Sequence, residues 1–303
     1  MDQLRAMTTF VGVASAGGFA AAGRELGLSA PSVTRLVSEL ETKLGARLFH
    51  RTTRSLQLTQ AGARYLDDCI RILADLEEAG RQVAGVHGEP SGKVSITGSG
   101  MFGRLVLTPL LYELMDVYPK LSISTFFVDR VVHMVDEGYD VAVRIAHLPD
   151  SSLTATRVGT VRRVVCASPD YIFAHGLPVE PDDLDDHACI DVSALSPTGV
   201  WDFEMDRGSV SKAVNARLRV NTADAAIVAA IEGRGVTRVL SYMIADHVKS
   251  GALQIVMQPH ETPPVPVHVM HKEVGQTSAR VRATVDHLVK KLRASPALDH
   301  GAA

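Results

Sequence analysis

The sequence predicts a chain in two parts of different fold class: a small α+β module with a long helix behind it, and a larger α/β domain. Apolar residues recur at three- and four-residue steps through residues 4–44, and two short strand-like runs follow at 48–51 and 56–58. From residue 93, strands and helices alternate up to a closing helix over 279–293, which favours largely parallel sheets. The Gly-, Pro- and Ser-rich stretch 85–93 between the parts predicts a linker.

Charge is distributed unevenly between these parts. Residues 1–58 contain seven Lys or Arg and four Asp or Glu, a net charge of +3, whereas the whole chain has −3, so the remainder has −6. A basic segment on an acidic body indicates a polyanionic partner for the first part only. The chain start lacks the layout of a signal peptide, and no run of about 18 apolar residues occurs. We therefore expect a cytoplasmic protein with no membrane partner.

The first module begins with three short predicted helices. One ends at Gly17, and the segment FAAAGREL forms a second that ends before Gly27. Ser29 is a good N-cap for the third, and Pro31 lies in its first turn, where the missing N–H costs nothing. The inward face of this third helix is expected to contain Val33, Leu36, Val37, Leu40 and Leu44. The outward face then contains Pro31, Thr34, Arg35 and Ser38.

A hairpin and a long helix complete this module. The two strand-like runs flank a polar turn with Thr52, Thr53 and Arg54. Thr59 is the expected N-cap of a helix over residues 60–86, whose apolar stripe suits pairing with another helix. We expect dimerisation through the stripe residues Tyr65, Cys69, Ile72, Leu73, Leu76 and Val83.

The start of the third helix suits contact with DNA. Its first two turns contain small residues, a proline and Arg35 but no acid, so the free N–H groups and the positive dipole end are open to phosphates. A helix, a tight turn and such a second helix form the helix-turn-helix plan. Arg35 can reach guanine or phosphate, and Ser32 and Thr34 can bond bases or phosphates. Arg51 and Arg54 of the hairpin could hold phosphate or a minor groove. The alternative is an amphipathic three-helix module with a solvated basic face.

A glycine motif in the second part supports two different functions. Residues 97–103, TGSGMFG, contain G-x-G-x-x-G after a strand and before a helix, and Asp129 ends the next strand. This arrangement is typical of dinucleotide binding and predicts, as an alternative, an NAD(P)-binding oxidoreductase with an appended DNA-binding domain. Asp129 lies later than the usual distance of about 20 residues, and no catalytic acid/base constellation follows. The same helix start, with Ser99, would also suit a small carboxylate or polar effector.

The residues FVGVASAGGFAAAGRELGLSAPSVTRLVSELETKLGARLFHRTTRSLQLTQAG closely resemble the amino-terminal domain of LysR-type transcriptional regulators. DVAVRIAHLPDSSL, RRVVCASPDYIFAHGLP and GRGVTRVLSYMIADHVKSGAL resemble that family's effector domain, so the resemblance spans nearly the whole chain. It is greatest for the branch with CrgA- and AphB-like regulators.

The resemblance implies a winged helix-turn-helix over 1–59, a dimerising linker helix over 60–86, a hinge over 87–92 and an effector domain over 93–303. This last domain would have two lobes of the periplasmic-binding-protein type, one at about 93–162 and 267–295 and the other at about 163–266. In the recognition helix Ser29, Pro31, Thr34 and Arg35 match the family pattern, whereas Ala30 and Ala20 stand where the family often has Gln and Ser.

The resemblance also implies an effector pocket between the lobes. Its expected residues are Ser99, Gly100, Met101, Phe102, Val128, Arg144 and Ile145 from the first lobe and Pro197, Thr198, Trp201 and Thr222 from the second. Arg144 could pair with an anionic effector, or alternatively form a structural ion pair with Asp140 or another acid. Trp201 is alternatively a core residue.

No metal or cofactor is expected. The cysteines Cys69, Cys166 and Cys189 are far apart, and His268 and His271 should point to opposite faces of a strand. The expected partners are double-stranded operator DNA, a small-molecule effector, further copies of the chain as a dimer and a tetramer or larger assembly, and RNA polymerase. A third possibility is a sensor that acts through proteins and whose DNA-binding domain is vestigial.

Overall fold

The chain forms two compact units, Met1–Gly92 and Lys93–Ala303. The computed structural model describes residues 2–51, 56–83, 89–130, 132–134, 136–148, 153–272 and 278–299. Among these residues, no helix combines the length and the hydropathy that crossing a bilayer requires.

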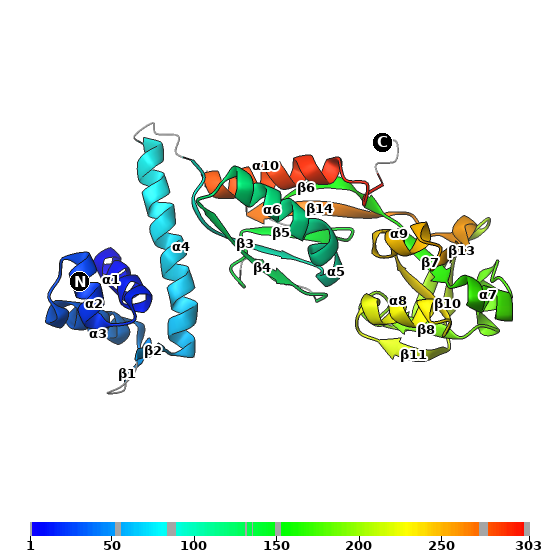
Figure 1. Ribbon diagram of the computed structural model, residues 1–303, viewed down its shortest axis with the longest axis horizontal. Helices are drawn as coiled ribbons and strands as arrows, with labels where there is room; N and C mark the ends of the chain where they lie inside the picture. Colours follow the sequence, from blue (N-terminus) through cyan, green and yellow to red (C-terminus); the bar gives the residue numbers. More distant parts are fainter. Residues whose placement is uncertain are drawn as a thin grey trace. The chain divides into compact units, whose positions relative to one another are not determined.

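The first unit contains three packed helices, a hairpin and a long helix (Figure 1). The helices are α1 (Gln3–Ala16), α2 (Phe19–Leu26) and α3 (Ala30–Leu44), and the hairpin pairs β1 (Phe49–Arg51) with β2 (Leu56–Leu58). Gly17, Gly27 and Gly45 end the three helices in the left-handed conformation, at φ of 66°, 64° and 65°. Gly17 and Gly27 are the signals that predicted the ends of the first two helices, and Gly45 ends the third in the same conformation.

The core of the first unit joins the helices to the hairpin. Phe10 is fully buried and its ring lies 5.3 Å from that of Phe49 on β1 and 5.8 Å from that of Tyr65 on α4 (Gln60–Val83). Val33, Val37 and Leu40 of α3 are also fully buried in this cluster. The predicted inward stripe of the third helix is therefore confirmed except at Leu44, which is 39% exposed.

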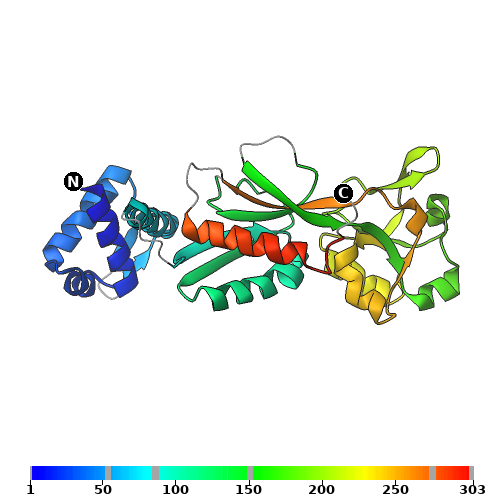
Figure 2. The same ribbon diagram turned by 90° about the horizontal axis from the view of Figure 1, so that it is seen from above.

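The second unit contains two mixed five-stranded sheets, each with helices (Figures 1 and 2). The first lobe has the strand order β4-β3-β5-β14-β6, formed by β4 (Leu121–Phe127), β3 (Gly92–Gly98), β5 (Val141–Ile145), β14 (Val265–Lys272) and β6 (Leu153–Val161). Its helices α6 (Thr108–Val117) and α10 (Ala279–Arg293) lie side by side against the sheet.

The second lobe has the strand order β11-β8-β12-β7-β13. Its strands are β11 (Ala216–Val220), β8 (Cys189–Val192), β12 (Val236–Leu240), β7 (Arg163–Ala167) and β13 (Gln254–Val256). The helices α7 (Pro169–His175), α8 (Ala223–Ile231) and α9 (Ser241–Lys249) belong to this lobe, as does a hairpin of β9 (Val200–Met205) and β10 (Gly208–Ala213).

The prediction of largely parallel sheets was wrong. β14 is antiparallel to both β5 and β6, and β7 is antiparallel to both β12 and β13. Both sheets are mixed because the chain crosses between the lobes within nearly continuous strands: β6 ends at Val161 and β7 begins at Arg163. The chain therefore runs in one direction through β6 and β7, and each of these strands is antiparallel to its neighbours in its own sheet.

The crossing is held by polar contacts around Arg162. Its guanidinium lies 3.0 Å from both carboxylate oxygens of Glu261, on the returning chain segment, and 3.6 Å from Asp299. The backbone of Asp299 in turn exchanges two hydrogen bonds with Thr160 at the end of β6. Burial raises the pKa of Glu261, and the charge of Arg162 opposes this rise. The two crossing segments and the segment at Asp299 are thus tied to one another.

Candidate functional site

The exposed start of α3 is built by local capping. Ser29 Oγ accepts a hydrogen bond from the Ser32 backbone N–H at 3.3 Å and lies 2.8 Å from Ser32 Oγ. Pro31 is exposed in the first turn, which contains no acid. The structure thus brings Ser29, Pro31 and Ser32 together at the positive end of the helix dipole, a position that favours an anion.

Thr34 and Arg35 follow one turn later, and they differ in how far their polar groups are already engaged within the helix. The Thr34 hydroxyl donates to the Ala30 carbonyl at 3.0 Å, so it presents its lone pairs rather than its proton to a partner. The side chain of Arg35 is 72% exposed, and its Nε lies 3.9 Å from Glu39 Oε1. An exposed pair of this kind contributes only about 0.3–0.5 kcal/mol, so Arg35 can leave it for a DNA group.

The hairpin residues expected to contact DNA are only partly within the described chain. Arg51 ends β1 and is paired with Leu56, and its side chain lies outside the description. Arg54, together with Thr52 and Thr53 of the predicted turn, lies outside the described residues.

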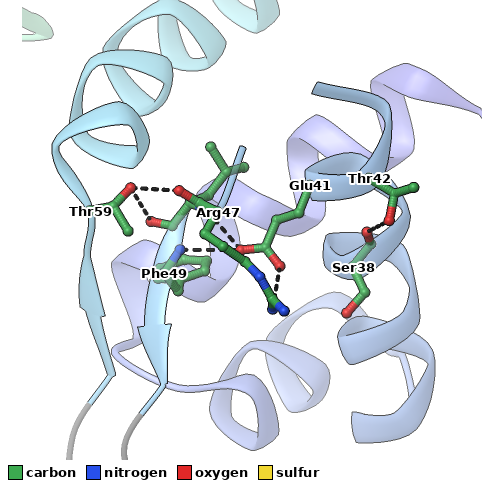
Figure 3. Close-up of polar contacts among 7 residues, drawn as sticks. Ser38, Glu41, Thr42, Arg47, Phe49 and Thr59 are labelled. Atoms are coloured by element: carbon green, nitrogen blue, oxygen red, sulfur yellow. Dashed lines mark hydrogen bonds and ion pairs between the residues drawn. The ribbon is translucent and has the colours of Figure 1, made fainter. Parts of the chain in front are cut away.

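Glu41 connects α3 to the hairpin, a role that was not predicted from the sequence (Figure 3). Its side chain is 5% exposed, and Oε1 accepts hydrogen bonds from the backbone N–H groups of Leu48, at 2.8 Å, and Phe49, at 3.3 Å. The exposed Arg47 lies 3.8 Å from Oε2. An available signal was the position of Glu41, four residues after Val37 and therefore on the inward face of the helix.

The long helix α4 begins against the same segment. Thr59 Oγ1 donates to the Arg47 carbonyl at 2.7 Å and accepts from the Gly62 N–H at 2.9 Å, while the Thr59 N–H donates to the Leu48 carbonyl at 2.9 Å. Thr59 therefore caps α4, as predicted. The residues just before β1 thus contact Glu41 at one end of α3 and the first turn of α4 (Figure 3).

The predicted dimerisation stripe of α4 divides between two faces. Cys69 is fully buried and, with the half-buried Tyr65 and Leu73, packs against the first unit's own helices. Burial raises the pKa of the Cys69 thiol to about 11, so it stays protonated at neutral pH. The fully buried Cys69 serves the fold of its own chain, which corrects its place in the predicted stripe, while Tyr65 and Leu73 contact this core with part of their surface. Ile72 and Leu76 are 41% and 50% exposed, and the side chain of Val83 lies outside the description.

The second unit contains a cavity of about 810 Å³ lined by both lobes. The first lobe contributes apolar residues, namely Met101, Val128, Val132, Met134, Val143, Ile145, Ala146, Leu148, Leu153 and Met270. It also contributes the polar residues Ser99, Asp129, Arg130, His133, Asp136, Arg144 and His147. The second lobe contributes Val192, Ala194, Leu195, Ala223, Leu240 and Met243. Its volume and mostly apolar wall are those of a small-molecule site.

The structure brings most of the predicted first-lobe residues to this cavity. Its wall contains Ser99, Met101, Val128, Arg144 and Ile145. Phe102 lies behind the wall, fully buried, with its ring 5.1 Å from that of Tyr242 in an edge-to-face contact. Gly100 donates its N–H to Asp129 Oδ1 at 2.9 Å and is not part of the wall.

None of the second-lobe residues expected in the pocket lines the cavity. Pro197, Thr198 and Thr222 are exposed elsewhere. Trp201 is 1% exposed and donates its indole N–H to Asp191 Oδ1 at 3.1 Å, with the Arg238 guanidinium 5.6 Å from its ring. For Trp201, the contacts therefore agree with the alternative of a core residue.

The second-lobe wall includes strand ends that were not predicted from the sequence. Val192 is the last residue of β8 and Leu240 the last of β12, and Ala223 begins α8. Ligands of open α/β sheets bind beyond the carboxyl ends of the strands. That rule could have found these residues, but the strand β8 was not among the predicted elements.

Arg144 is the unusual polar group of the cavity. Its Nη2 is buried and has no hydrogen-bond partner among the described residues. The carboxylate of Asp140, the partner considered from the sequence, accepts instead from the Ser95 N–H at 2.8 Å. Burial lowers the pKa of Arg144, and the charge of Glu137 opposes this shift. A desolvated guanidinium with an unused donor is suited to receive an anion.

The G-x-G-x-x-G motif has a packing role in this structure. A Cβ on Gly103 would lie 2.2 Å from the Phe127 ring, and one on Gly98 would lie 3.2 Å from Leu107. The Asp129 carboxylate accepts the Gly100 N–H at the point where a pyrophosphate would bind in a dinucleotide fold. The first turn, Gly100–Phe102, continues as the π-helix Gly103–Leu107 rather than as a regular α-helix. Close packing thus explains the glycines without a dinucleotide.

Comparison with known families decides the identity of the chain. Residues 4–63 match the family described as bacterial regulatory helix-turn-helix protein, lysR family, and residues 87–293 match the LysR substrate binding domain. The chain belongs to the LysR family. It is a LysR-type transcriptional regulator with a DNA-binding helix-turn-helix domain and an effector-binding domain. The alternative of an NAD(P)-binding oxidoreductase has no support among its relatives, which are regulators.

Two curated LysR-type relatives from Escherichia coli (strain K12) match almost the whole chain. The HTH-type transcriptional regulator DmlR is 32% identical over 94% of this chain and 93% of that protein. The HTH-type transcriptional activator AaeR is 28% identical over 95% of this chain and 93% of that protein.

Solved structures of LysR-type regulators show the same fold. CrgA from Neisseria meningitidis, a LysR-type transcriptional regulator, superposes with a TM-score of 0.62 at 26% identity over 95% of this chain and 98% of that one. The full-length virulence activator AphB from Vibrio cholerae superposes with a TM-score of 0.62 at 23% identity, with the same coverage. The predicted family, fold class and resemblance to CrgA- and AphB-like regulators are confirmed.

Proposed function

We propose that this LysR-type regulator reads operator DNA through the start of α3, at Ser29, Pro31, Ser32, Thr34 and Arg35, with Arg51 and Arg54 of the hairpin on the DNA backbone. The observation that supports this most directly is the capped, acid-free and exposed first turn of α3, followed by an Arg35 side chain that is 72% exposed. Selection of bound DNA from a random pool, with and without candidate metabolites, tests it. Failure to enrich any sequence would contradict it.

Arg35→Ala should weaken binding to the selected operator by about 1–3 kcal/mol, because a long donor side chain at the groove is lost. Gel shifts at fixed salt measure the change, and binding to unrelated DNA should fall much less. Lys43→Ala is the matched control, since Lys43 is an exposed cation in the last turn of the same helix. Equal specific affinity for the wild type and Arg35→Ala would contradict the assigned role.

The exposed residues of α4 are proposed as the dimer contact. Ile72 and Leu76 lie one turn apart and leave an apolar stripe uncovered on an otherwise polar helix. Two such stripes packed together would place two α3 helices for the two half-sites of an operator. Assembly to a tetramer or larger state would use further contacts of the second unit.

Replacement of both Ile72 and Leu76 by Glu should convert the dimer to monomers, because like charges would meet in the paired stripe. Sedimentation velocity measures the mass. Ala63→Glu is the control, since Ala63 is exposed nine residues before Ile72 and therefore on the opposite face of the helix. Dimers that persist in the double variant would exclude this face.

The cavity of the second unit is proposed as the effector site, in a protein that acts in the cytoplasm and communicates with RNA polymerase. An effector that binds one relative placement of the two lobes more tightly than others would shift the population toward that placement. A protein-acting sensor without DNA binding remains the competing function, and loss of all salt-dependent DNA binding by the intact protein would favour it.

A further inference from the structure

The cavity wall is not only apolar but unusually adaptable. Met101, Met134, Met243 and Met270 all line it, out of nine methionines in the whole chain. Met101, Met243 and Met270 come from three different elements of the two lobes and Met134 from a loop, and each is at most 8% exposed. Methionine is unbranched and polarizable, so such a wall can fit apolar groups of different shapes. The body of a ligand here should be apolar and need not have one rigid outline.

The polar groups of the wall differ in what they have left to offer. Arg130 is held by Glu137 through two hydrogen bonds, at 2.9 and 2.7 Å. Arg144, by contrast, has its Nη2 buried and unpartnered among the described residues, and it lies on the cavity wall. The Ser99 hydroxyl lies on the same wall and interacts with the buried hydroxyl of Tyr242. An unused cationic donor in a desolvated site matches a single carboxylate.

Acidic side chains limit the ligand to one negative group. Asp129 and Asp136 also line the cavity, and the carboxylate of Asp129 is fixed there by the Gly100 N–H. A second carboxylate on the ligand would be placed beside these acids in a mostly apolar cavity, where like charges repel more strongly than in water.

We propose that the effector is a monocarboxylate with an apolar body, whose carboxylate pairs with Arg144 and whose body packs against the methionine wall. This rests on the proposed function of the cavity as the effector site. The cavity of about 810 Å³ has room for a body well beyond the size of acetate. Linear and ring-containing bodies share this chemistry.

Calorimetric titration of the full-length protein with octanoate, acetate, octanamide and octanedioate tests the proposal. Octanoate should bind saturably. Octanamide, which lacks the charge, acetate, which lacks the body, and octanedioate, which adds a second charge, should each bind at least tenfold more weakly. Phenylpropanoate should bind like octanoate if ring-containing bodies fit, and octanoate alone would assign the site to linear ones. Equal binding of octanoate and octanamide, or stronger binding of octanedioate, would overturn the proposal.

Variants separate the carboxylate contact from the body contact. Arg144→Gln should bring the affinity for octanoate down to that for octanamide, while octanamide itself should bind as before. That unchanged octanamide binding also shows that the variant is folded. Arg157→Gln is the control: Arg157 and Arg144 both lie opposite His268, on strands at either side of β14, but Arg157 is exposed and does not line the cavity. Loss of acid preference in both variants, or in neither, would exclude Arg144 as the carboxylate partner.

DNA binding distinguishes this proposal from the proposed function. Octanoate that binds with the expected preferences should change operator affinity or the pattern of protected DNA in the same preparation. If it binds but leaves DNA binding unchanged, the chemistry of the cavity stands and its role as the effector site fails. If operator binding is intact and responds to another class of molecule while octanoate and phenylpropanoate do not bind, the monocarboxylate proposal alone fails.

Discussion

Gly62→Ala should destabilise the first unit by about 2–3 kcal/mol, the upper part of the range of about 1–3 kcal/mol expected when extra volume is forced into a tightly packed site. A Cβ at this position would lie 2.0 Å from the carbonyl oxygen of Leu48 and 2.9 Å from its carbonyl carbon. Backbone atoms cannot move aside as a flexible side chain can. The first turn of α4 would have to separate from the segment before β1, which breaks the hydrogen bond from Thr59 N–H to Leu48.

The same helix offers a control of opposite sign. Gly80 is exposed, and among the described residues a Cβ there would have no atom within 4 Å other than those of its own helix turn, so Gly80→Ala should stabilise α4 by up to about 1 kcal/mol through helix propensity. Circular dichroism follows the unfolding of both units, whereas Trp201, the single tryptophan, reports on the second unit. The fluorescence transition should stay in place in both variants. A Gly62→Ala protein as stable as Gly80→Ala would contradict the packing constraint.

Local signals in the sequence explain how much of the first unit could be predicted. Ser29 and Thr59 do cap their helices, and Gly17 and Gly27 do end theirs, because caps and left-handed residues depend on few neighbours. The apolar period of α3 likewise identified Val33, Val37 and Leu40 as core residues.

What the sequence did not reveal depends on tertiary neighbours. The spacing of apolar residues along α4 does not indicate which of them pack against the same domain. Cys69 and Ile72 were therefore predicted to have the same role, although Cys69 is buried and Ile72 is exposed. G-x-G-x-x-G reads the same whether the glycines admit a phosphate or, as here, the Phe127 ring. To predict which second-lobe residues line the cavity, one needs the order of the strands in that sheet. Local sequence patterns do not determine this order.

Glu41→Ala should lower the free energy of unfolding of the first unit by about 2–3 kcal/mol. It should also reduce the specific DNA affinity, and this loss should be proportionally larger than the loss of stability. The substitution leaves the buried N–H groups of Leu48 and Phe49 without an acceptor, and each such group costs about 1–3 kcal/mol before the chain relaxes. Relaxation would move the start of β1, and with it the hairpin, relative to α3. Phosphate contacts from the hairpin and base contacts from α3 could then no longer be made together.

Glu41→Gln separates the hydrogen bond from the charge. The amide oxygen can still accept from Leu48 and Phe49, so this variant should retain more stability than Glu41→Ala and most of the specific DNA affinity at a temperature where both are folded. Glu39→Ala, which removes an acid 42% exposed on the same helix, should change stability by no more than about 0.5 kcal/mol. Hydrogen exchange at the Leu48 and Phe49 amides measures whether their hydrogen bonds are lost. Gel shifts measure whether specific DNA affinity falls with them. Fast exchange in Glu41→Ala with unchanged operator affinity would show that the hairpin's placement does not matter for recognition. Equal loss of operator affinity in Glu41→Ala and Glu41→Gln would assign the effect to the charge near Arg47 instead.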